Sequence, residues 1–471
     1  MESVYSPIPQ KKPRAAMAAL GLGFFITVLD ATIINIAIPT IADELNSSLS
    51  KVLWTVNIYT LVITAFLISM GRLGDYFGPK RLFIIGMIIF AIASFFCGIS
   101  SSTELLVLSR LLQAIGAAMI IPQPMVIIIQ TFPQVHRPWA FGLWGATGGI
   151  AAVVGPTLGG GVITLFGWPS IFFINIPLGI LIIILAYRFL PECKCNPKEG
   201  FDLIGLILLT LSLGTISFSL MEWDSYELIF SVFMFLLGIA MLLFFCMQQK
   251  FNQSKYPIIP FGIFYANNYS KMLIVIGLNA IAILTLIITL SIYLQTTLKI
   301  NPIYTGFVIA PASLCSIIIS TLIGRLSTKF SLFALLKSGL FVTALGIMIL
   351  IFNVFNKTSI EIFIMSMVII GIGNGLTVAP MNLLAMENVS SDLVGAASGF
   401  LNTVRQLGMA LAGIVLGCIL QGSQSRSPMF YRIFNDRDYV IMFSFLLPFL
   451  FIVFGFAIVM SIRVFSCRNK P

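Results

Sequence analysis

Fourteen predominantly hydrophobic runs, each at least 18 residues long, follow one another along this chain. They span residues 15–38, 52–70, 82–99, 104–128, 139–165, 170–190, 202–221, 226–247, 271–295, 304–323, 332–352, 359–384, 395–420 and 438–464. An α-helix needs about 20 apolar residues to cross the hydrocarbon core of a bilayer. The runs lack the alternation of apolar and polar residues that is typical of a membrane β-barrel. The pattern therefore predicts an all-α membrane protein with 14 transmembrane spans.

The composition excludes soluble, fibrous and disordered proteins. Hydrophobic residues make up 58% of the chain and charged residues only 9%, whereas soluble domains carry about 25% charged residues. The first run is too long for the apolar core of a signal peptide, and it contains Asp30. We therefore expect it to remain in the protein as a membrane span.

The basic residues predict the orientation of the chain in the membrane. With the N-terminus in the cytoplasm, 19 of the 27 lysines and arginines fall in cytoplasmic segments, six fall outside, and Arg110 and Arg405 lie within spans. This distribution follows the positive-inside rule and puts both termini in the cytoplasm. It also accounts for the net charge of +10, so nucleic-acid binding is not expected. With a single histidine, His136, the sequence gives no reason to expect a metal site.

Two long cytoplasmic segments, 191–201 and 248–270, flank the seventh and eighth runs. We therefore predict an N-terminal six-helix bundle over 1–190, two extra spans with their cytoplasmic loops over 191–270, and a C-terminal six-helix bundle over 271–471. A duplicated bundle of this kind places its substrate site between the halves, near the middle of the membrane.

Asp30 and Arg110 are the candidate proton-coupling residues. Asp30 is the only carboxylate that we place in the apolar part of a span. An ionised, unpaired acid there costs several kcal/mol, so Asp30 is suited to taking up and releasing a proton or to binding a substrate cation. Arg110 stays charged and needs a partner, and Gln113 shares its helix face. The alternatives are a neutral structural Asp30, a permanent Asp30–Arg110 pair, and an Arg110 that bonds only to backbone carbonyls.

Several polar or aromatic stripes are candidates for the wall of a substrate cavity. Ser398, Asn402 and Arg405 share one helix face, although snorkelling of Arg405 to the interface is an equally good explanation. Phe25 could hold a lipophilic cation by cation–π attraction. The candidate cavity residues are Phe25, Trp54, Asn57, Gln113, Tyr293, Asn374, Asn402 and Arg405.

A glycine-rich loop is predicted after the second span, over residues 71–81. Its candidate gating residues are Gly71, Arg72, Gly74, Asp75, Gly78 and Arg81. Asp75 can pair with arginines or with the N-terminus of a neighbouring helix. We interpret the loop as an electrostatic latch on the inner side, with an ordinary basic turn as the alternative.

The fifth span is predicted to be tightly packed and bendable. Gly155 and Gly159 form a small-xxx-small pair that lets helices approach closely, and Gly160 follows. Pro156 removes a helical hydrogen bond between them.

These segments resemble the major facilitator superfamily and, within it, the fourteen-span drug/proton antiporter family of multidrug efflux pumps. The matching segments are 29–39, 71–81, 110–116, 155–160 and 402–408. In this family the acid matching Asp30 is implicated in coupling, the residue matching Arg110 in proton transfer, and the motif around Pro156 in export. The chain departs from the family where Pro169 follows Trp168, and it has no second acid in the tenth span.

The resemblance implies a major facilitator fold of two six-helix bundles plus two extra helices in the bacterial cytoplasmic (inner) membrane. It implies a proton-coupled exporter of lipophilic, cationic or neutral compounds that works by alternating access, and not an enzyme. The alternative is a dedicated exporter of an endogenous metabolite, such as a siderophore or lipid-like molecule. The expected partners are the small substrate, protons and the bilayer, with the proton as coupling ion and no other cofactor. A monomer is compatible with the pattern, and the oligomeric state is left open.

Overall fold

The computed structural model describes residues 13–192, 202–221, 228–252, 257–266, 268–300, 302–356, 359–390, 393–422 and 437–461. The regular elements of this part of the chain are helices. The first group comprises α1 (Pro13–Glu44), α2 (Leu49–Phe77), α3 (Pro79–Gly98), α4 (Thr103–Ile120), α5 (Gln123–Thr131), α6 (Arg137–Phe166), α7 (Ser170–Phe173) and α8 (Asn175–Phe189). Two further helices are α9 (Leu203–Met221) and α10 (Leu228–Asn252). The last group comprises α11 (Gly262–Tyr265), α12 (Tyr269–Thr296), α13 (Pro302–Leu326), α14 (Leu332–Asn356), α15 (Ile360–Met386), α16 (Val394–Gly422) and α18 (Arg437–Ser461).

The predicted helical membrane fold is confirmed. Ten described segments are long and apolar enough to cross a bilayer, and two shorter apolar helices accompany them. Two predicted spans are each divided into two helices. The run 104–128 is divided between α4 and α5 at Pro122 and Pro124, because proline interrupts the hydrogen bonds of a helix and favours the start of a new one. The run 170–190 is divided between α7 and α8. The total of 14 spans stays a prediction.

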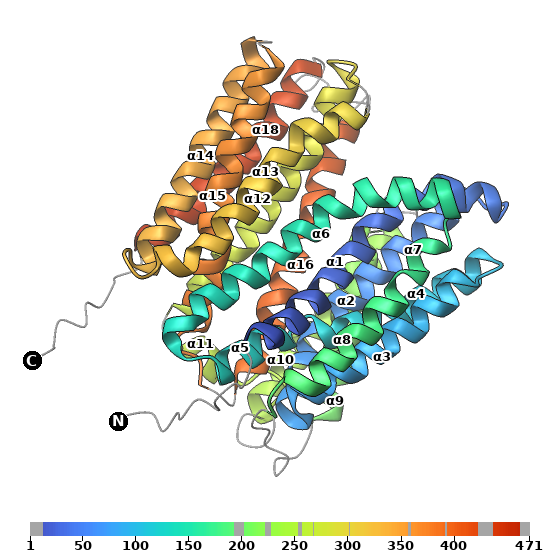
Figure 1. The fold of residues 1–471 in the computed structure, drawn as a ribbon, viewed down its shortest axis with the longest axis vertical. Coiled ribbons are helices and arrows are strands. Elements are labelled where there is room, and N and C mark those ends of the chain that lie inside the picture. The colour runs from blue at the N-terminus through green and yellow to red at the C-terminus, as the bar shows by residue number, and fades with distance from the viewer. Residues whose placement is uncertain are drawn as a thin grey trace, which may run out of the picture.

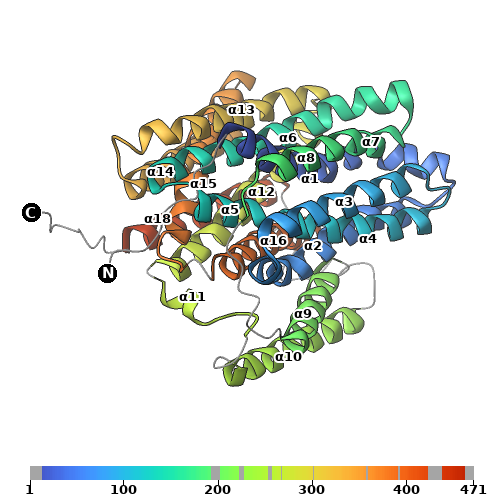
Figure 2. The ribbon, with the colours of Figure 1, turned by 60° about the horizontal axis from the view of Figure 1, so that its bottom comes forward.

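The two groups of helices form two bundles that meet at one end and diverge at the other (Figure 1). Contacts between the bundles join α6 to α13 and α2 to α16. Helices α9 and α10 pack against each other on the outside of the bundles, where α9 contacts α2 and, less extensively, α16 (Figure 2). Smaller contacts between the bundles join α6 to α15 and α5 to α16, so each bundle keeps its own packing while α2, α5 and α6 connect it to the other half.

The prediction of a loop over residues 71–81 is wrong. Helix α2 continues to Phe77 and α3 begins at Pro79, so only Gly78 lies between them. Gly78 has a φ of 96°, which glycine adopts without strain. Hydrophobicity falls after Met70, and we attribute this to α2 leaving the hydrocarbon core there while its backbone hydrogen bonds continue for two more turns.

Candidate functional site

A buried ion pair joins α1 to α4. The Asp30 side chain and the Arg110 side chain are both completely inaccessible to solvent, and Arg110 Nη1 donates a hydrogen bond to Asp30 Oδ2. Removing two charges from water is costly, and the cost is recovered only where further hydrogen bonds satisfy their remaining polar atoms. The sequence left open whether these two residues meet, and the structure brings them together.

Two amide side chains complete the surroundings of the Asp30 carboxylate. Gln113 Nε2 donates to Asp30 Oδ1 at 2.9 Å, and Asn175 Nδ2 donates to the same oxygen at 2.8 Å. Gln113 Nε2 also lies 2.8 Å from Ser94 Oγ. Helices α1, α3, α4 and α8 thus each contribute one polar side chain or more to a single cluster.

Arg110 is held from several directions. Its Nε donates to the Thr55 carbonyl at 3.1 Å, and its Nη1 also donates to Gln113 Oε1 at 2.6 Å. The guanidinium lies 4.2 Å from the centre of the Tyr59 ring, a distance at which a cation is attracted to an aromatic face. Among the described residues, Arg110 Nη2 and Asn175 Oδ1 are buried without a hydrogen-bond partner. The cluster therefore retains one donor nitrogen, with two N–H groups, and one acceptor oxygen for a new partner.

The cluster lies toward one end of the N-terminal bundle. Ser94 is four residues from the end of α3, Arg110 is seven residues from the start of α4, and Asn175 begins α8. At about 1.5 Å per residue, Ser94 and Arg110 are about 6 and 10 Å from these helix ends. These ends are opposite to the end at which Asp75 lies on α2.

At that opposite end, Asp75 bridges the two bundles. Its carboxylate oxygens accept hydrogen bonds from the backbone N–H groups of Gly395 and Ala396, both at 2.9 Å. These groups belong to the first turn of α16, where the helix dipole favours a negative charge. Arg72 Nη1 lies 3.9 Å from Asp75 Oδ2. A helix N-terminus and an arginine were the two kinds of partner that the sequence suggested for Asp75.

Two glycines of the same segment of α2 let other helices approach its backbone closely. A Cβ atom on Gly71 would lie 2.3 Å from the Gly395 carbonyl oxygen, and one on Gly74 would lie 2.3 Å from Gln123 Oε1. A side chain at Gly71 would therefore push α2 away from α16. Arg81 is exposed on α3.

The glycines of α6 pack against α1 one turn beyond Asp30. A Cβ atom on Gly155 would lie 2.1 Å from Thr32 Oγ1, and one on Gly159 would lie 2.5 Å from Ile33 Cγ1. Pro156 and Gly160 belong to α6, but their side-chain surroundings lie outside the described part of the chain.

The candidate cavity residues do not form one cluster. Gln113 belongs to the Asp30 cluster, and Phe25 and Asn57 are partly exposed. The Trp54 ring lies 5.7 Å from the Phe218 ring of α9, so it packs toward the extra helices.

Two other candidates lie in the C-terminal bundle. Tyr293 is buried, with its ring 5.8 Å from that of Phe363. Asn374 Nδ2 lies 3.4 Å from Ser316 Oγ.

Arg405 and Asn402 form a second polar cluster, on α15 and α16. Arg405 Nη1 donates to Asn402 Oδ1 at 3.2 Å, and Arg405 Nη2 donates to Asn382 Oδ1 at 2.7 Å. Ser398 Oγ, on the same face of α16, donates to the Pro122 carbonyl of the other bundle at 2.8 Å.

Sequence reasoning missed Ser94, Thr55, Tyr59, Asn175 and Asn382 as members of these clusters. The two asparagines carried a usable signal, because a polar amide within an apolar run is costly unless it faces a partner. Thr55 contributes a backbone carbonyl, which no side-chain pattern reveals.

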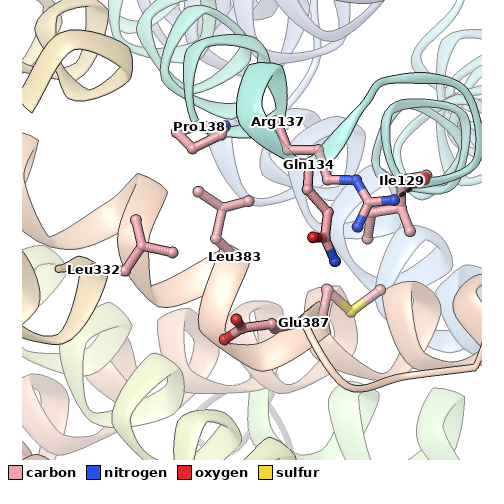
Figure 3. Close-up of a pocket in the computed structure, with 8 residues that line it drawn as sticks. Ile129, Gln134, Arg137, Pro138, Leu332, Leu383 and Glu387 are labelled. Carbon is pink, nitrogen blue, oxygen red and sulfur yellow. Dashed lines mark hydrogen bonds between the residues drawn. The ribbon is translucent and has the colours of Figure 1, made fainter. Parts of the chain in front are cut away.

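A small hollow separates the bundles at the Asp75 end. Its volume is about 110 Å³, and it is lined by Ile129, Gln134, Arg137 and Pro138 from one bundle and by Leu332, Leu383, Met386 and Glu387 from the other. Leu383 lies near Leu332 and Pro138, while Arg137 points toward the side of Ile129 (Figure 3). Arg137 Nη2 donates to the Ile129 carbonyl at 2.7 Å. We call this contact region at the Asp75 end the inner seam, after the orientation that the basic residues predict. It is closed by contacts at the helix ends but is not filled throughout.

Comparison with known proteins gives a consistent result. The sequence model of the Major Facilitator Superfamily matches residues 20–199 and 199–413. The multidrug resistance protein Stp of Mycobacterium tuberculosis (strain CDC 1551 / Oshkosh) is 29% identical over 411 residues, which cover 86% of this chain and 75% of Stp. The riboflavin transporter RibZ of Clostridioides difficile (strain 630) is 31% identical over 398 residues, which cover 83% of this chain and 84% of RibZ. The solved structure of the proton:xylose symporter XylE matches with a TM-score of 0.66 at 12% identity, covering 94% of both chains, which shows a shared fold alone.

Proposed function

Because the chain belongs to the Major Facilitator Superfamily and is related to its drug efflux members, we propose that it is a proton-coupled exporter of lipophilic compounds that works by alternating access. The family consists of membrane transporters, and the protein is not an enzyme. The resemblance seen in the sequence motifs is thereby confirmed at the level of the family. Proton coupling, the substrate class and the location in a bacterial cytoplasmic membrane with both termini inside are proposals.

The buried Asp30–Arg110 pair is the observation that carries the proposal. A proton on Asp30 removes the negative charge that compensates Arg110, so the pair becomes unfavourable in its buried position. An amide offers both donors and an acceptor, and Asn175 Oδ1 has no partner among the described residues. Rotation of the Asn175 amide would let it accept a hydrogen bond from the protonated acid. Protonation thus changes the bonds between α1, α4 and α8 together.

Proton movement supplies enough free energy for efflux. One charge crossing a potential of about 100 mV releases about 2.3 kcal/mol, and one pH unit corresponds to about 1.4 kcal/mol. Since about 1.4 kcal/mol corresponds to a tenfold concentration ratio, one proton can sustain a gradient of roughly tenfold to several-hundredfold for a neutral compound.

The contacts between the bundles support alternating access. Gly71 and Asp75 contact the first turn of α16 at one end, and the bundles diverge at the other (Figure 1). With the orientation that the basic residues predict, we propose that this state is open to the outside. We propose that protonation of Asp30 in this state favours the return to a state open to the cytoplasm, where substrate binds.

A dedicated metabolite exporter is the second candidate, because one relative is named for transport of riboflavin. The two functions differ in the range of compounds that the protein transports. Substitutions at Asn374 and Tyr293 should change the preferences of a drug exporter among many compounds, whereas they should abolish the transport of one compound by a dedicated exporter. Transport of a panel of chemically unrelated dyes by the variants separates these outcomes.

The test of proton coupling compares purified wild type, Asp30→Asn and Asp43→Asn in proteoliposomes. Asp43 lies exposed on the same helix, so its variant is a chemically matched control. The probes are ethidium, dansyl-phenylalanine and its uncharged amide, and protein-free liposomes correct for passive leak. We expect an imposed pH gradient to drive at least one probe in wild type and Asp43→Asn, and a protonophore to stop it.

In Asp30→Asn, gradient-driven movement should fall to the level of protein-free liposomes while the protein stays folded. Undiminished movement in Asp30→Asn, or movement insensitive to the protonophore in wild type, would contradict the proposal.

A further inference from the structure

Arg405 carries a positive charge that no described carboxylate neutralises. Its guanidinium donates to the amide oxygens of Asn402 and Asn382, and no acidic group among the described residues lies within ion-pair distance of it. A guanidinium does not lose its proton in a protein, and a charge within a membrane span requires compensation. Arg110 receives that compensation from Asp30, whereas Arg405 receives none from the acidic residues that the structure describes.

The face of α16 that carries Arg405 meets the N-terminal bundle at Ser398. Ser398, two turns earlier on the same face of α16, donates to the Pro122 carbonyl of the N-terminal bundle. Asn382 and Asn402 are 1% and 5% exposed. Two nitrogens of the guanidinium are fixed by these amides, so snorkelling to a headgroup does not explain its position. Of the five N–H donors of arginine, three remain for a ligand.

Asp30, the acid that would attract a cation, is less accessible than Arg405. The Asp30 side chain is completely inaccessible, already paired with Arg110 and covered by Gln113 and Asn175. Arg405 is partly exposed by contrast, so its charge is the more accessible of the two to a compound between the bundles.

We propose that Arg405, held by Asn382 and Asn402, binds the acidic group of the transported compound, and that the substrates are amphipathic organic anions with a carboxylate or a similar group. A guanidinium fork matches a carboxylate in geometry as well as charge. This inference rests on the proposed transport function and replaces the cationic or neutral substrate class that the sequence suggested.

The charge of the substrate has a consequence for energetics. Exchange of one internal monovalent anion for one external proton moves two charges in the same electrical direction. Exchange of a monovalent cation for one proton moves no net charge. Transport of an anion should therefore depend on the membrane potential even without a pH gradient.

The test measures equilibrium binding of dansyl-phenylalanine and its uncharged amide to the purified full chain in detergent. The variants are Arg405→Gln and Arg405→Lys, with Arg325→Gln, at an exposed position of α13, as the matched control. We expect Arg405→Gln to weaken binding of the carboxylate probe roughly ten- to hundredfold, as for loss of a charged hydrogen bond. Binding of the amide should change by less than about threefold, and Arg405→Lys should retain part of the preference.

Asn382→Ala keeps the charge while removing one of its supports, so it should weaken carboxylate binding less than Arg405→Gln does. Thermal unfolding of each variant verifies its fold. Wild type that binds the carboxylate no more tightly than the amide, or an Arg405→Gln variant that loses both equally, would overturn the proposal.

A transport assay then separates this inference from proton coupling. In proteoliposomes, a potassium diffusion potential should drive dansyl-phenylalanine in wild type but not in Arg405→Gln. Because the binding measurement needs no gradient, a failure of coupling at Asp30 leaves the anion preference intact. A potential that drives ethidium but not dansyl-phenylalanine would contradict the anionic substrate class.

Discussion

At the scale of single residues, Asp30 and Arg110 depend on each other. Each is fully buried, so each is the main compensation for the charge of the other. Removal of one partner from a buried pair costs about 3–5 kcal/mol, mostly because the remaining charge has no counterion, whereas removal of both can be nearly neutral. Stability and transport should therefore respond differently to single and double substitutions.

We predict that Arg110→Gln lowers the thermal stability of the purified protein strongly, by an amount equivalent to about 3 kcal/mol or more. The double variant Asp30→Asn/Arg110→Gln should recover most of the loss, because no unpaired charge remains. Neither variant should show proton-driven transport. Thermal unfolding in detergent and the proteoliposome assay provide the two measurements.

If the double variant is as unstable as Arg110→Gln, the hydrogen bonds of Arg110 to Thr55 and Gln113 matter more than its charge. That result would contradict the interpretation of the pair as mutual compensation.

At the scale of helices, α2 contacts different partners along its length. Its inner end meets α16 through Gly71 and Asp75. Farther along, Ser69 Oγ lies 3.2 Å from Thr210 Oγ1 of α9, and Trp54 packs on Phe218 of α9. Helix α2 thus belongs both to the seam between the bundles and to the attachment of the extra helices.

Gly71→Ala is expected to open the inner seam. Its new Cβ atom would lie 2.3 Å from the Gly395 carbonyl, a backbone atom that cannot move without shifting α16. Nitroxide labels at the exposed positions Phe77 and Phe330 should report a longer distance between the bundles by pulsed electron paramagnetic resonance. Gly161→Ala, where nothing lies within 4 Å of the added atom, should leave the distance unchanged.

Equal distances in the two glycine variants would show that the seam tolerates a methyl group. The close contact of α2 with α16 would then not depend on the absence of a side chain at Gly71.

Trp54→Ala should weaken the attachment of α9 and leave the choice of substrate unchanged. The ring packs on Phe218, and truncation of a packed aromatic costs about 3 kcal/mol when it is fully buried and less when, as here, it is partly exposed. A lower unfolding temperature with an unaltered ratio of rates among the three fluorescent probes is the expected result. A changed ratio would instead support the prediction from the sequence that Trp54 lines the substrate cavity.

At the scale of the whole molecule, the alternating-access mechanism proposed above requires the two bundles to exchange which end is closed. The described state has its bundles joined at the Asp75 end, with a hollow of about 110 Å³ left between them. A side chain that fills this hollow adds apolar contact only while the inner seam is closed, and so it should shift the population toward that state.

Leu383→Trp is the substitution that tests this shift. Leu383 lines the hollow beside Leu332 and Pro138 (Figure 3), and the larger ring should hold the inner seam closed. We expect a narrower distribution of distances between labels at Phe77 and Phe330, together with slower turnover. Leu383→Ala removes contact at the same place and should broaden the distribution. The same shift in both variants would indicate that packing in the hollow does not control the equilibrium.

The sequence by itself determined the helical membrane fold, because long apolar runs leave a hydrogen-bonded helix as the suitable state in a bilayer. It also identified Asp30, Arg110, Asp75 and Arg405, because a charged residue in or beside a membrane span is rare and has a high free-energy cost. The glycine-rich segment was located correctly, but hydropathy marked where α2 leaves the apolar core and not where the helix ends. The extent of that helix was therefore mispredicted.

Only the tertiary structure decided which of these groups meet. Asn175 lies 145 positions from Asp30 in the chain, and Gly395 lies 320 positions from Asp75, so no local pattern links them. The packing of α1, α4 and α8 neutralises Asp30, while the packing of α15 and α16 gives Arg405 two neutral amides and, within the part of the chain that the structure describes, no carboxylate. A sequence shows that a charge is present, but the free energy of that charge depends on neighbours that folding brings from distant parts of the chain.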